Sequence, residues 1–403
     1  MPAAVGCEPD AVAGRAAICV NGGGEPTGPR KGVPVDGTRI ERLARVLTEY
    51  SLELQPEERV VMIGSPLAAP LLLAAYQHAL RLGAFPILDV HLPEAQEILL
   101  REGNDAQLQA ISPLEAFASL EADARLSVIA PENTRMLAGI DPARQQVFSR
   151  ARASLRERHL ERAAQGELKW CGTLFPTAAL AQEADMSLRD YTEFVVRAGF
   201  LDDPDPVARW RDLAAYQQRL IDWLTPRHEV HVVGPDTDLR LRISGRTWIN
   251  SDGHRNFPSG EIFVGPVEDS VEGHIRFTHA TIVQGREVED VRLWFERGRV
   301  VKATAAKNED FLEAMLNTDE GARYLGEFAF GTNRAIDRFT RNILFDEKIG
   351  GTIHMALGAG YPDSGSRNQS AIHWDLICDL RQGGQVTVDG EVFLKDGEYV
   401  VQG

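Results

Sequence analysis

The hydrophobic pattern of this chain changes near residue 228, and this change constrains the fold more than any other feature. Before it, extended and helical patterns alternate. Short apolar runs predict buried strands, and amphipathic stretches between them predict helices. The predicted strands are 59–64 ("RVVMIG"), 85–91 and 126–130, and the helices include 39–52 and 66–84. Strands that alternate with helices form a parallel sheet. Residues 140–225 are predicted to be mostly helical.

After residue 228, charged and apolar residues alternate along several segments, as in antiparallel strands with one wet face. The clearest are "EVHVVG" (229–234), "HIRFTHATIV" (274–283) and "VRLWFERGRVVKATA" (291–305). Two Asp-Gly pairs, at 389–390 and 396–397, predict tight hairpins near the end. We therefore predict three parts. Residues 1–35, rich in Gly, Pro and Ala, form a flexible extension, residues 36–230 an N-terminal α/β domain of βαβ type, and residues 231–403 a β-rich α+β catalytic domain.

Composition excludes some partners. The formal charge of −16 argues against nucleic acid and anionic membranes, because both need clustered Lys and Arg. The sequence has no apolar run of 18 residues and does not begin with a basic, then apolar, secretory signal. Its four cysteines (Cys7, Cys19, Cys171 and Cys378) form no CxxC pair, so we expect a reduced, cytoplasmic protein. Neither GxGxxG nor a P-loop is present, which leaves a nucleotide site unsupported.

The stretch "SAIHWDLICD" (370–379) combines a strand pattern with polar residues in an apolar frame. His373 and Asp375 fall on one face of that strand, and Trp374 and Leu376 on the other. Similar apolar or glycine-rich frames surround further polar residues: Glu261, Glu327, Glu347, His354 and Tyr361. Each alone has an ordinary explanation, since a single Glu is usually solvated and a single core His usually hydrogen-bonded. As a set they are costly to bury without partners.

A divalent cation removes that cost. Imidazole and carboxylate ligands without thiolate suit Zn²⁺, Co²⁺ or Mn²⁺. Six candidate ligands exceed what one catalytic zinc takes, and they suit two ions about 3.5–4 Å apart that share a bridging carboxylate. The four positive charges of two such ions match the four carboxylates. We therefore predict a two-metal centre in the C-terminal part.

Five stretches, in this order, resemble the M29 family of metallo-aminopeptidases, the thermophilic aminopeptidase or aminopeptidase T/S group. They are "WCGTLFPTAALAQEADMS", "PSGEIFVGP", "GEFAFGTN", "LFDEKIGGTIHMALGAGYP" and "SAIHWDLICDL", within a similarity that runs from about residue 40 to 400. The resemblance implies a two-domain, two-metal exopeptidase, usually a homodimer, that removes N-terminal amino acids from peptides. Its metal ions are Zn, Co, Mn or Mg. The metal-binding positions of the family fall on Glu261, Glu327, Glu347, His354, His373 and Asp375, and its tyrosine falls on Tyr361.

The implied reaction is hydrolysis by water that the two metals activate. Either Glu261 or Glu327 would take the proton of the water while the other bridges the metals, and Tyr361 would stabilise the oxyanion. Two alternatives stay open. One is a two-metal amidase or phosphoesterase, which nearby cations would favour: Arg334, Arg338, Arg341 and Arg367. The other is a non-catalytic metal-binding α/β protein.

Overall fold

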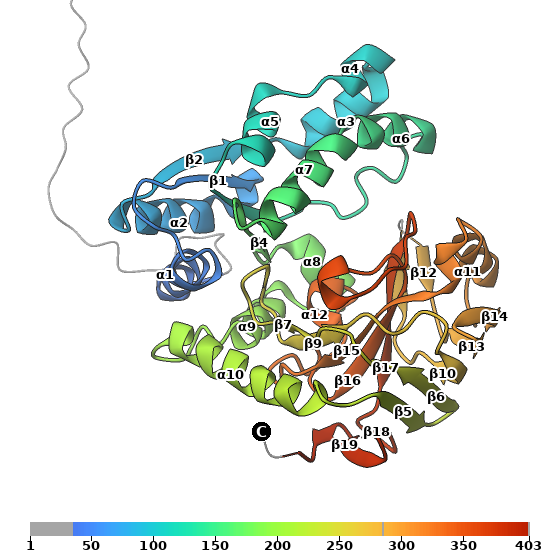
Figure 1. The fold of residues 1–403 in the computed structure, drawn as a ribbon. Helices are drawn as coiled ribbons and strands as arrows, with labels where there is room; N and C mark the ends of the chain where they lie inside the picture. The colour runs from blue at the N-terminus through green and yellow to red at the C-terminus, as the bar shows by residue number, and fades with distance from the viewer. Residues whose placement is uncertain (1–34, 284–285, 402–403) are drawn as a thin grey trace, which may run out of the picture. The chain divides into compact units, whose positions relative to one another are not determined.

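A five-stranded parallel sheet organises the N-terminal half of the computed structural model, which describes residues 35–283 and 286–401 (Figure 1). The strand order is β2-β1-β3-β4-β8. The strands are β1 (Arg59–Gly64), β2 (Phe85–Val90), β3 (Ala124–Ile129), β4 (Lys169–Leu174) and β8 (Asn256–Phe257). The prediction of an N-terminal α/β fold with a parallel sheet is confirmed. The predicted extension falls almost entirely on residues 1–34, outside the described residues.

Helices connect these strands. They are α1 (Gly37–Arg45), α2 (Ala69–Arg81), α3 (Pro93–Glu102), α4 (Asp105–Gln109), α5 (Pro113–Leu120), α6 (Pro142–Ala151), α7 (Ala153–Ala164), α8 (Ala178–Glu183), α9 (Leu188–Ala198) and α10 (Pro206–Leu224). Side-chain caps begin several of them, for example where the Ser187 hydroxyl accepts a hydrogen bond from the backbone N–H of Asp190 at the start of α9. Gly83 lies two residues past α2, where the sequence predicts the helix to have ended. Its φ of +81° is the left-handed conformation that glycine often adopts after a helix.

Strand β4 lies in the region that the sequence predicts to be mostly helical. It is an interior strand of the sheet, hydrogen-bonded to β3 and β8, and Cys171, Thr173 and Leu174 are buried. A short strand between two helices has too few residues to set a period of its own, which is why the helical pattern around it hid it. Strand β8 comes from far along the chain, beyond the boundary predicted near residue 230. That boundary stays a prediction.

Two antiparallel sheets form most of the C-terminal half. The larger has the order β14-β13-β10-β6-β5-β18-β19-β20. Its strands are β5 (Glu229–Gly234), β6 (Thr237–Arg242), β10 (Glu272–Arg276), β13 (Arg292–Glu296), β14 (Arg299–Thr304), β18 (Gln385–Val388), β19 (Glu391–Lys395) and β20 (Glu398–Tyr399). Both predicted Asp-Gly turns are present between its last strands, with φ positive at Asp389, Gly390, Asp396 and Gly397.

The second sheet, called the central sheet here, has the order β17-β16-β15-β9-β7. Its strands are β7 (Ile249–Ser251), β9 (Glu261–Val264), β15 (Leu325–Gly331), β16 (Thr352–Gly358) and β17 (His373–Asp379). A separate hairpin pairs β11 (Thr281–Val283) with β12 (Arg286–Val288). Two further helices, α11 (Glu309–Leu316) and α12 (Ile343–Asp346), complete the predicted β-rich α+β arrangement.

One apolar core lies between these two antiparallel sheets. From the central sheet it takes alternate residues of four strands: Ile262, Val264, Phe328, Phe330, Ile353, Met355, Leu357, Trp374, Leu376 and Cys378. The larger sheet contributes Val230, Val232, Leu239, Leu241, Ile275 and Leu293. Because side chains alternate along a strand, the residues between these project from the other face of the central sheet. That other face is where the predicted site residues lie.

The core role of Trp374 can be tested directly. Its side chain is 2% exposed, and its indole N–H donates to the Thr281 hydroxyl at 3.0 Å. We expect Trp374→Ala to lower the free energy of unfolding by about 3–5 kcal/mol, because it leaves a large cavity. Urea denaturation measures this change. The control is Val301→Ala on β14, where the side chain is 46% exposed and the change should stay within about 0.5 kcal/mol. Equal stability of both variants would contradict the assignment of Trp374 to the core.

Candidate metal centre

Backbone register brings the predicted residues together on the outer face of the central sheet. Glu327 on β15 is paired with Ala356 on β16, which is paired in turn with Asp375 on β17, so these three form a row across the sheet. His354 lies two residues before Ala356, on the same face. Glu261 on β9 is paired with Gly331 of β15. Small residues (Ala329, Gly331 and Ala356) lie between the polar ones and leave room above the sheet.

The two Gly-Glu pairs noted in the sequence have a structural reason. Gly260 has a φ of +122°, and a Cβ there would lie 2.5 Å from the Cβ of Asn333. At Gly326, where the register between β15 and β16 shifts, a Cβ would lie 2.4 Å from the backbone oxygens of Gly358 and Ala359. Only glycine fits either position. Each glycine therefore sets the backbone path that delivers the glutamate following it.

Four carboxylates and two imidazoles meet in this space. The Nε2 atom of His354 lies 3.2 Å from Glu327 Oε1 and 3.4 Å from Glu261 Oε2. Oxygen and nitrogen atoms of Glu261, Glu347 and His354 lie within 4.8 Å of one another, and so do those of Glu327, His354 and Asp375. The structure thus brings five of the six predicted ligands into two overlapping groups that share His354.

His373, the sixth, lies at the edge of this cluster. Its Nε2 atom is 3.4 Å from Asp375 Oδ1, and its Nδ1 atom is 2.7 Å from the backbone oxygen of Ala359. A carbonyl oxygen only accepts, so Nδ1 carries a proton, and once the ring loses its second proton it presents the lone pair of Nε2 to the cluster. Tyr361 is its neighbour: the two ring centroids are 5.5 Å apart, and the tyrosine is half exposed.

Lys348 belongs to the cluster and was not singled out in the sequence. It is fully buried, lies 3.4 Å from Glu261 Oε1 and forms an ion pair with Glu347. The signal was present: the lysine precedes Ile349-Gly350-Gly351, the same apolar and glycine-rich setting as the other site residues. The neighbouring Asp346 is also buried, and its carboxylate accepts hydrogen bonds at 2.8 Å from both the backbone N–H and the hydroxyl of Thr340. This fixes the segment that carries Glu347 and Lys348.

Burial and mutual repulsion perturb the pKa values of the carboxylic acids in the cluster. Burial raises the pKa of Glu261, Glu327 and Glu347 above the usual range. Burial acts in the same direction on Asp375, but the contact with His373 outweighs it and lowers the pKa of Asp375.

The pKa values of the basic groups in the cluster are raised by the carboxylates around them. Burial lowers the pKa of His354, yet Glu327 and Glu261 outweigh this and raise it to about 9. The pKa of His373 is likewise raised to about 10, against the effect of burial, mainly by Asp375. For Lys348 too, burial is outweighed by Glu261 and Glu347, so its pKa is raised. The cluster therefore holds its positive charges tightly because its negative charge is in excess.

The donor set fits a divalent metal. Glu261 Oε2 and Asp375 Oδ1 are buried and make ionic contacts, but they have no hydrogen-bond donor among the described residues. Oxygen and imidazole ligands in this number are typical of Zn²⁺, Co²⁺ or Mn²⁺ sites. A metal ion binds neutral imidazole, so it would displace the protons that the carboxylates now hold on the histidines.

The arginines that would favour a phosphoester substrate are engaged elsewhere or lie outside the cluster. Arg334 donates to the backbone oxygen of Gly397 and lies 3.0 Å from Glu398. Arg341 is bound to Asp185 and Glu287. Among the described residues, the cationic side chains that form direct ion pairs with the candidate carboxylates are Lys348 and the two histidines.

A parallel-sheet half, an antiparallel half and a carboxylate–imidazole centre fit a metal-dependent enzyme. Comparison with known proteins agrees: a family model described as thermophilic metalloprotease (M29) matches residues 37–399. The chain belongs to this family, and with that assignment the predictions of the M29 family, of a hydrolase and of divalent-metal use are confirmed. Peptides are the substrates of this enzyme class.

Several named aminopeptidases align with this chain along most of their length. Aminopeptidase 2 of Geobacillus stearothermophilus is 27% identical, with 90% of this chain and 98% of the relative aligned. Aminopeptidase T of Thermus thermophilus is 28% identical, over 87% and 94% of the two chains. The solved structure of wild-type AmpT from Thermus thermophilus superposes with a TM-score of 0.79 at 25% identity, covering 90% of this chain and 99% of that one. In the described part of this chain, no helix has the length and apolar content that crossing a membrane requires.

The buried lysine gives a prediction about the centre itself. We expect Lys348→Met to destabilise the metal-free protein by about 3–5 kcal/mol, because Glu261 and Glu347 lose their countercharge inside the protein. Saturating divalent metal should recover much of this loss, since the ion supplies positive charge at the same place. The measurement is the melting temperature of both proteins with chelator and with added metal. An equal shift of the variant under both conditions would show that Lys348 is not part of the charge balance of the centre.

Proposed function

We propose that this protein is an aminopeptidase that uses two divalent metal ions and removes N-terminal residues from peptides. The observation that carries the proposal is the pair of overlapping ligand groups on one face of the central sheet, which share His354. One imidazole nitrogen serves one ion. His354 would therefore complete one group, with Glu261 and Glu347, and His373 would complete the other, with Glu327 and Asp375.

Charge supports two ions rather than one. With both histidines neutral, the four carboxylates and Lys348 carry a net charge of −3. One divalent ion would leave −1, and two would leave +1. A centre that stabilises negative charge on a substrate oxygen needs a net positive charge, and therefore two ions.

Bound metal ions would polarise the scissile carbonyl and lower the pKa of a coordinated water toward about 7. The chain supplies the remaining functions. Glu261 or Glu327 accepts a proton from the water and passes it to the leaving amine. Lys348 lies beside Glu261 but has no ion pair with Glu327, which favours Glu327 as the proton carrier and Glu261 as a fixed ligand. Tyr361, whose pKa is raised by burial and by Glu327, keeps its proton and can donate a hydrogen bond to the oxyanion.

The centre also explains why a free amine would be needed. A free amine can ligate a bound metal ion or donate hydrogen bonds to a site carboxylate, whereas an acylated amine has lost its basic lone pair and is bulkier. The identity of the ions among Zn, Co, Mn and Mg and the homodimer are finer parts of the same proposal and are supported by the family resemblance. The cytoplasmic location is another part, supported by the cysteine pattern.

The function is tested by comparing peptides with free and acetylated N-termini. We expect the free peptide to be cleaved one residue at a time from its N-terminus, and the acetylated one to be at least about 100-fold slower in kcat/KM, since it lacks the free amine that the centre binds. Mass spectrometry of the products and initial rates measure both. Chelation should abolish cleavage and divalent metal restore it, which serves as the control. Equal cleavage of both peptides would point to an endopeptidase.

The ligand assignment is tested by metal content. We expect His373→Ala to lose one of two ions and to lower kcat by several orders of magnitude, because one ligand group becomes incomplete. Trp374→Ala is the matched control: its side chain faces the core, so the folded fraction should retain both ions. In the same assay, Glu327→Gln should keep more metal than Glu261→Gln at similarly low activity, if Glu327 carries the proton. Elemental analysis of the purified variants decides each point, and two ions in His373→Ala would remove His373 from the ligand set.

A further inference from the structure

Two neighbouring cavities share lining residues, and the first of them reaches the candidate metal centre. The first, of about 400 Å³, is lined by His373 and Asp375 at one end and by Arg135 and Arg341 at the other. The second, of about 570 Å³, shares four lining residues with it: Arg135, Glu183, Ile282 and Arg341. Both volumes are in the range of about 300–1,000 Å³ that small-molecule sites occupy. Together they form a groove that starts at the candidate metal ligands.

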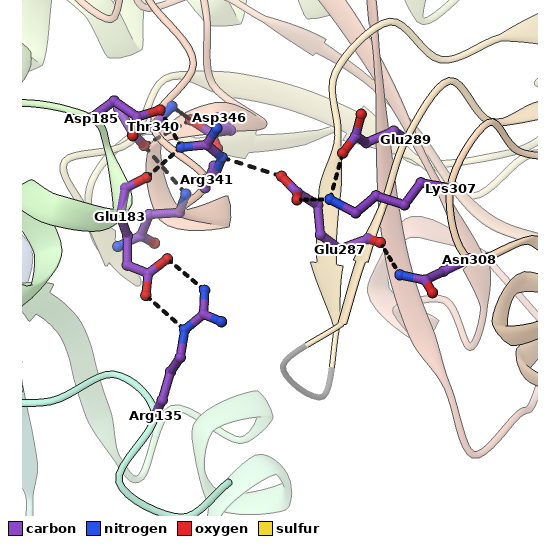
Figure 2. A network of polar contacts seen from close by, with 11 residues as sticks. Arg135, Glu183, Asp185, Glu287, Glu289, Lys307, Asn308, Thr340, Arg341 and Asp346 are labelled. Atoms are coloured by element: carbon purple, nitrogen blue, oxygen red, sulfur yellow. Dashed lines mark hydrogen bonds and ion pairs between the residues drawn. The ribbon is translucent and has the colours of Figure 1, made fainter.

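The character of this groove changes along its length. In the first cavity its walls include apolar side chains such as Phe339, Ile343 and Ile377. Its far end is charged, and Figure 2 shows the network there. Arg341 contacts Asp185 Oδ2 at 2.5 Å and Glu287 Oε1 at 3.3 Å, and Arg135 contacts Glu183 at 3.2 Å. Lys307 lies between Glu287 and Glu289, at 2.5 Å and 2.8 Å (Figure 2).

This far end gathers cationic side chains in a protein whose formal charge is −16. Four of them line it (Arg135, Arg286, Lys307 and Arg341), and four carboxylates lie along or beside it (Glu183, Asp185, Glu287 and Glu289). Three of the cations are paired with carboxylates. Arg286 has no carboxylate within 4.0 Å among the described residues, and its guanidinium group lies over the ring of Phe311, 5.2 Å from the centroid. Arg286 is therefore the cation left for a ligand.

The backbone of the β11–β12 hairpin leads from one end of the groove to the other. At one end, the Thr281 hydroxyl donates to the backbone oxygen of Asp375 at 3.3 Å, so β11 begins beside the metal centre. Arg286 is paired with Val283, two residues further along β11. Two strand residues span about 7 Å. An extended peptide covers the same distance with about two residues.

A short peptide with both ends free matches this pattern. Its free amine would bind at the metal centre, and its carboxylate end is negative. We propose that the groove selects peptides of about three or four residues and that Arg286 binds their C-terminal carboxylate. This inference rests on the proposed aminopeptidase activity, because it places the residues after the scissile bond along β11. Arg286 is then a specificity-determining residue remote from the reacting bond.

The test compares tripeptides that end in a free carboxylate with the same tripeptides as C-terminal amides. For the wild-type protein with metal, we expect kcat/KM to be about 3- to 10-fold higher for the acid, as suits one solvent-accessible ion pair. Arg286→Gln should lower this ratio to about one, mainly by raising KM for the acid, and leave the amide within about twofold. Arg299→Gln, at an exposed arginine on β14 that lines neither cavity, is the control and should keep the wild-type ratio.

Peptide length is the second readout. The preference for the acid should be largest at three or four residues and absent at eight, where the carboxylate passes beyond Arg286. Equal rates for acid and amide in the wild-type protein, or a preference that survives in Arg286→Gln, would overturn the proposal. A preference for an acidic side chain in place of the terminal carboxylate would overturn it as well. Failure to cleave any of these peptides would instead refute the aminopeptidase activity itself.

Discussion

Repulsion among four carboxylates, two buried and two nearly so, is the constraint on which this structure depends. Glu261, Glu327, Glu347 and Asp375 are held within a few ångströms on one face of a sheet whose other face is packed with apolar residues. Such a cluster is stable only with countercharge. Lys348 and the two histidines supply part of it, and their raised pKa values reflect the strength of the surrounding negative charge. Metal ions supply the rest, which links folding of the centre to its chemistry.

Much of this centre could be predicted from the sequence because strand geometry is regular. His373 and Asp375 are two residues apart, and period-2 alternation is enough to place both on one face and Trp374 on the other. The same alternation explains why β9, β15 and β16 each carry polar residues on that face. The strand boundaries at β1 and β5 and the two Asp-Gly turns also follow from local pattern alone, since their signals lie within a few residues.

Other features depend on contacts between distant segments, which local pattern does not contain. Lys348 is buried beside Glu261, 87 residues earlier, and although Ile349-Gly350-Gly351 indicates an unusual setting, the local sequence does not show which carboxylates the lysine meets. Strand β4 was hidden between helices because its burial comes from the neighbouring strands β3 and β8. The groove is a further case: Arg135, Glu183, Glu287 and Arg341 meet only through the fold.

Strand β8 ties the two halves of the chain together at the level of the backbone. Residues 256 and 257 extend the parallel sheet beyond β4, and the backbone N–H of Gly172 donates to the backbone oxygen of Arg255 at 2.8 Å. A fragment that stops near residue 230 would thus leave this edge of β4 unpaired, with its donors and acceptors open to other chains. During synthesis the sheet cannot be closed until the segment that leads into β9 and Glu261 has been made, so the completed N-terminal sheet and the first metal-binding strand emerge together.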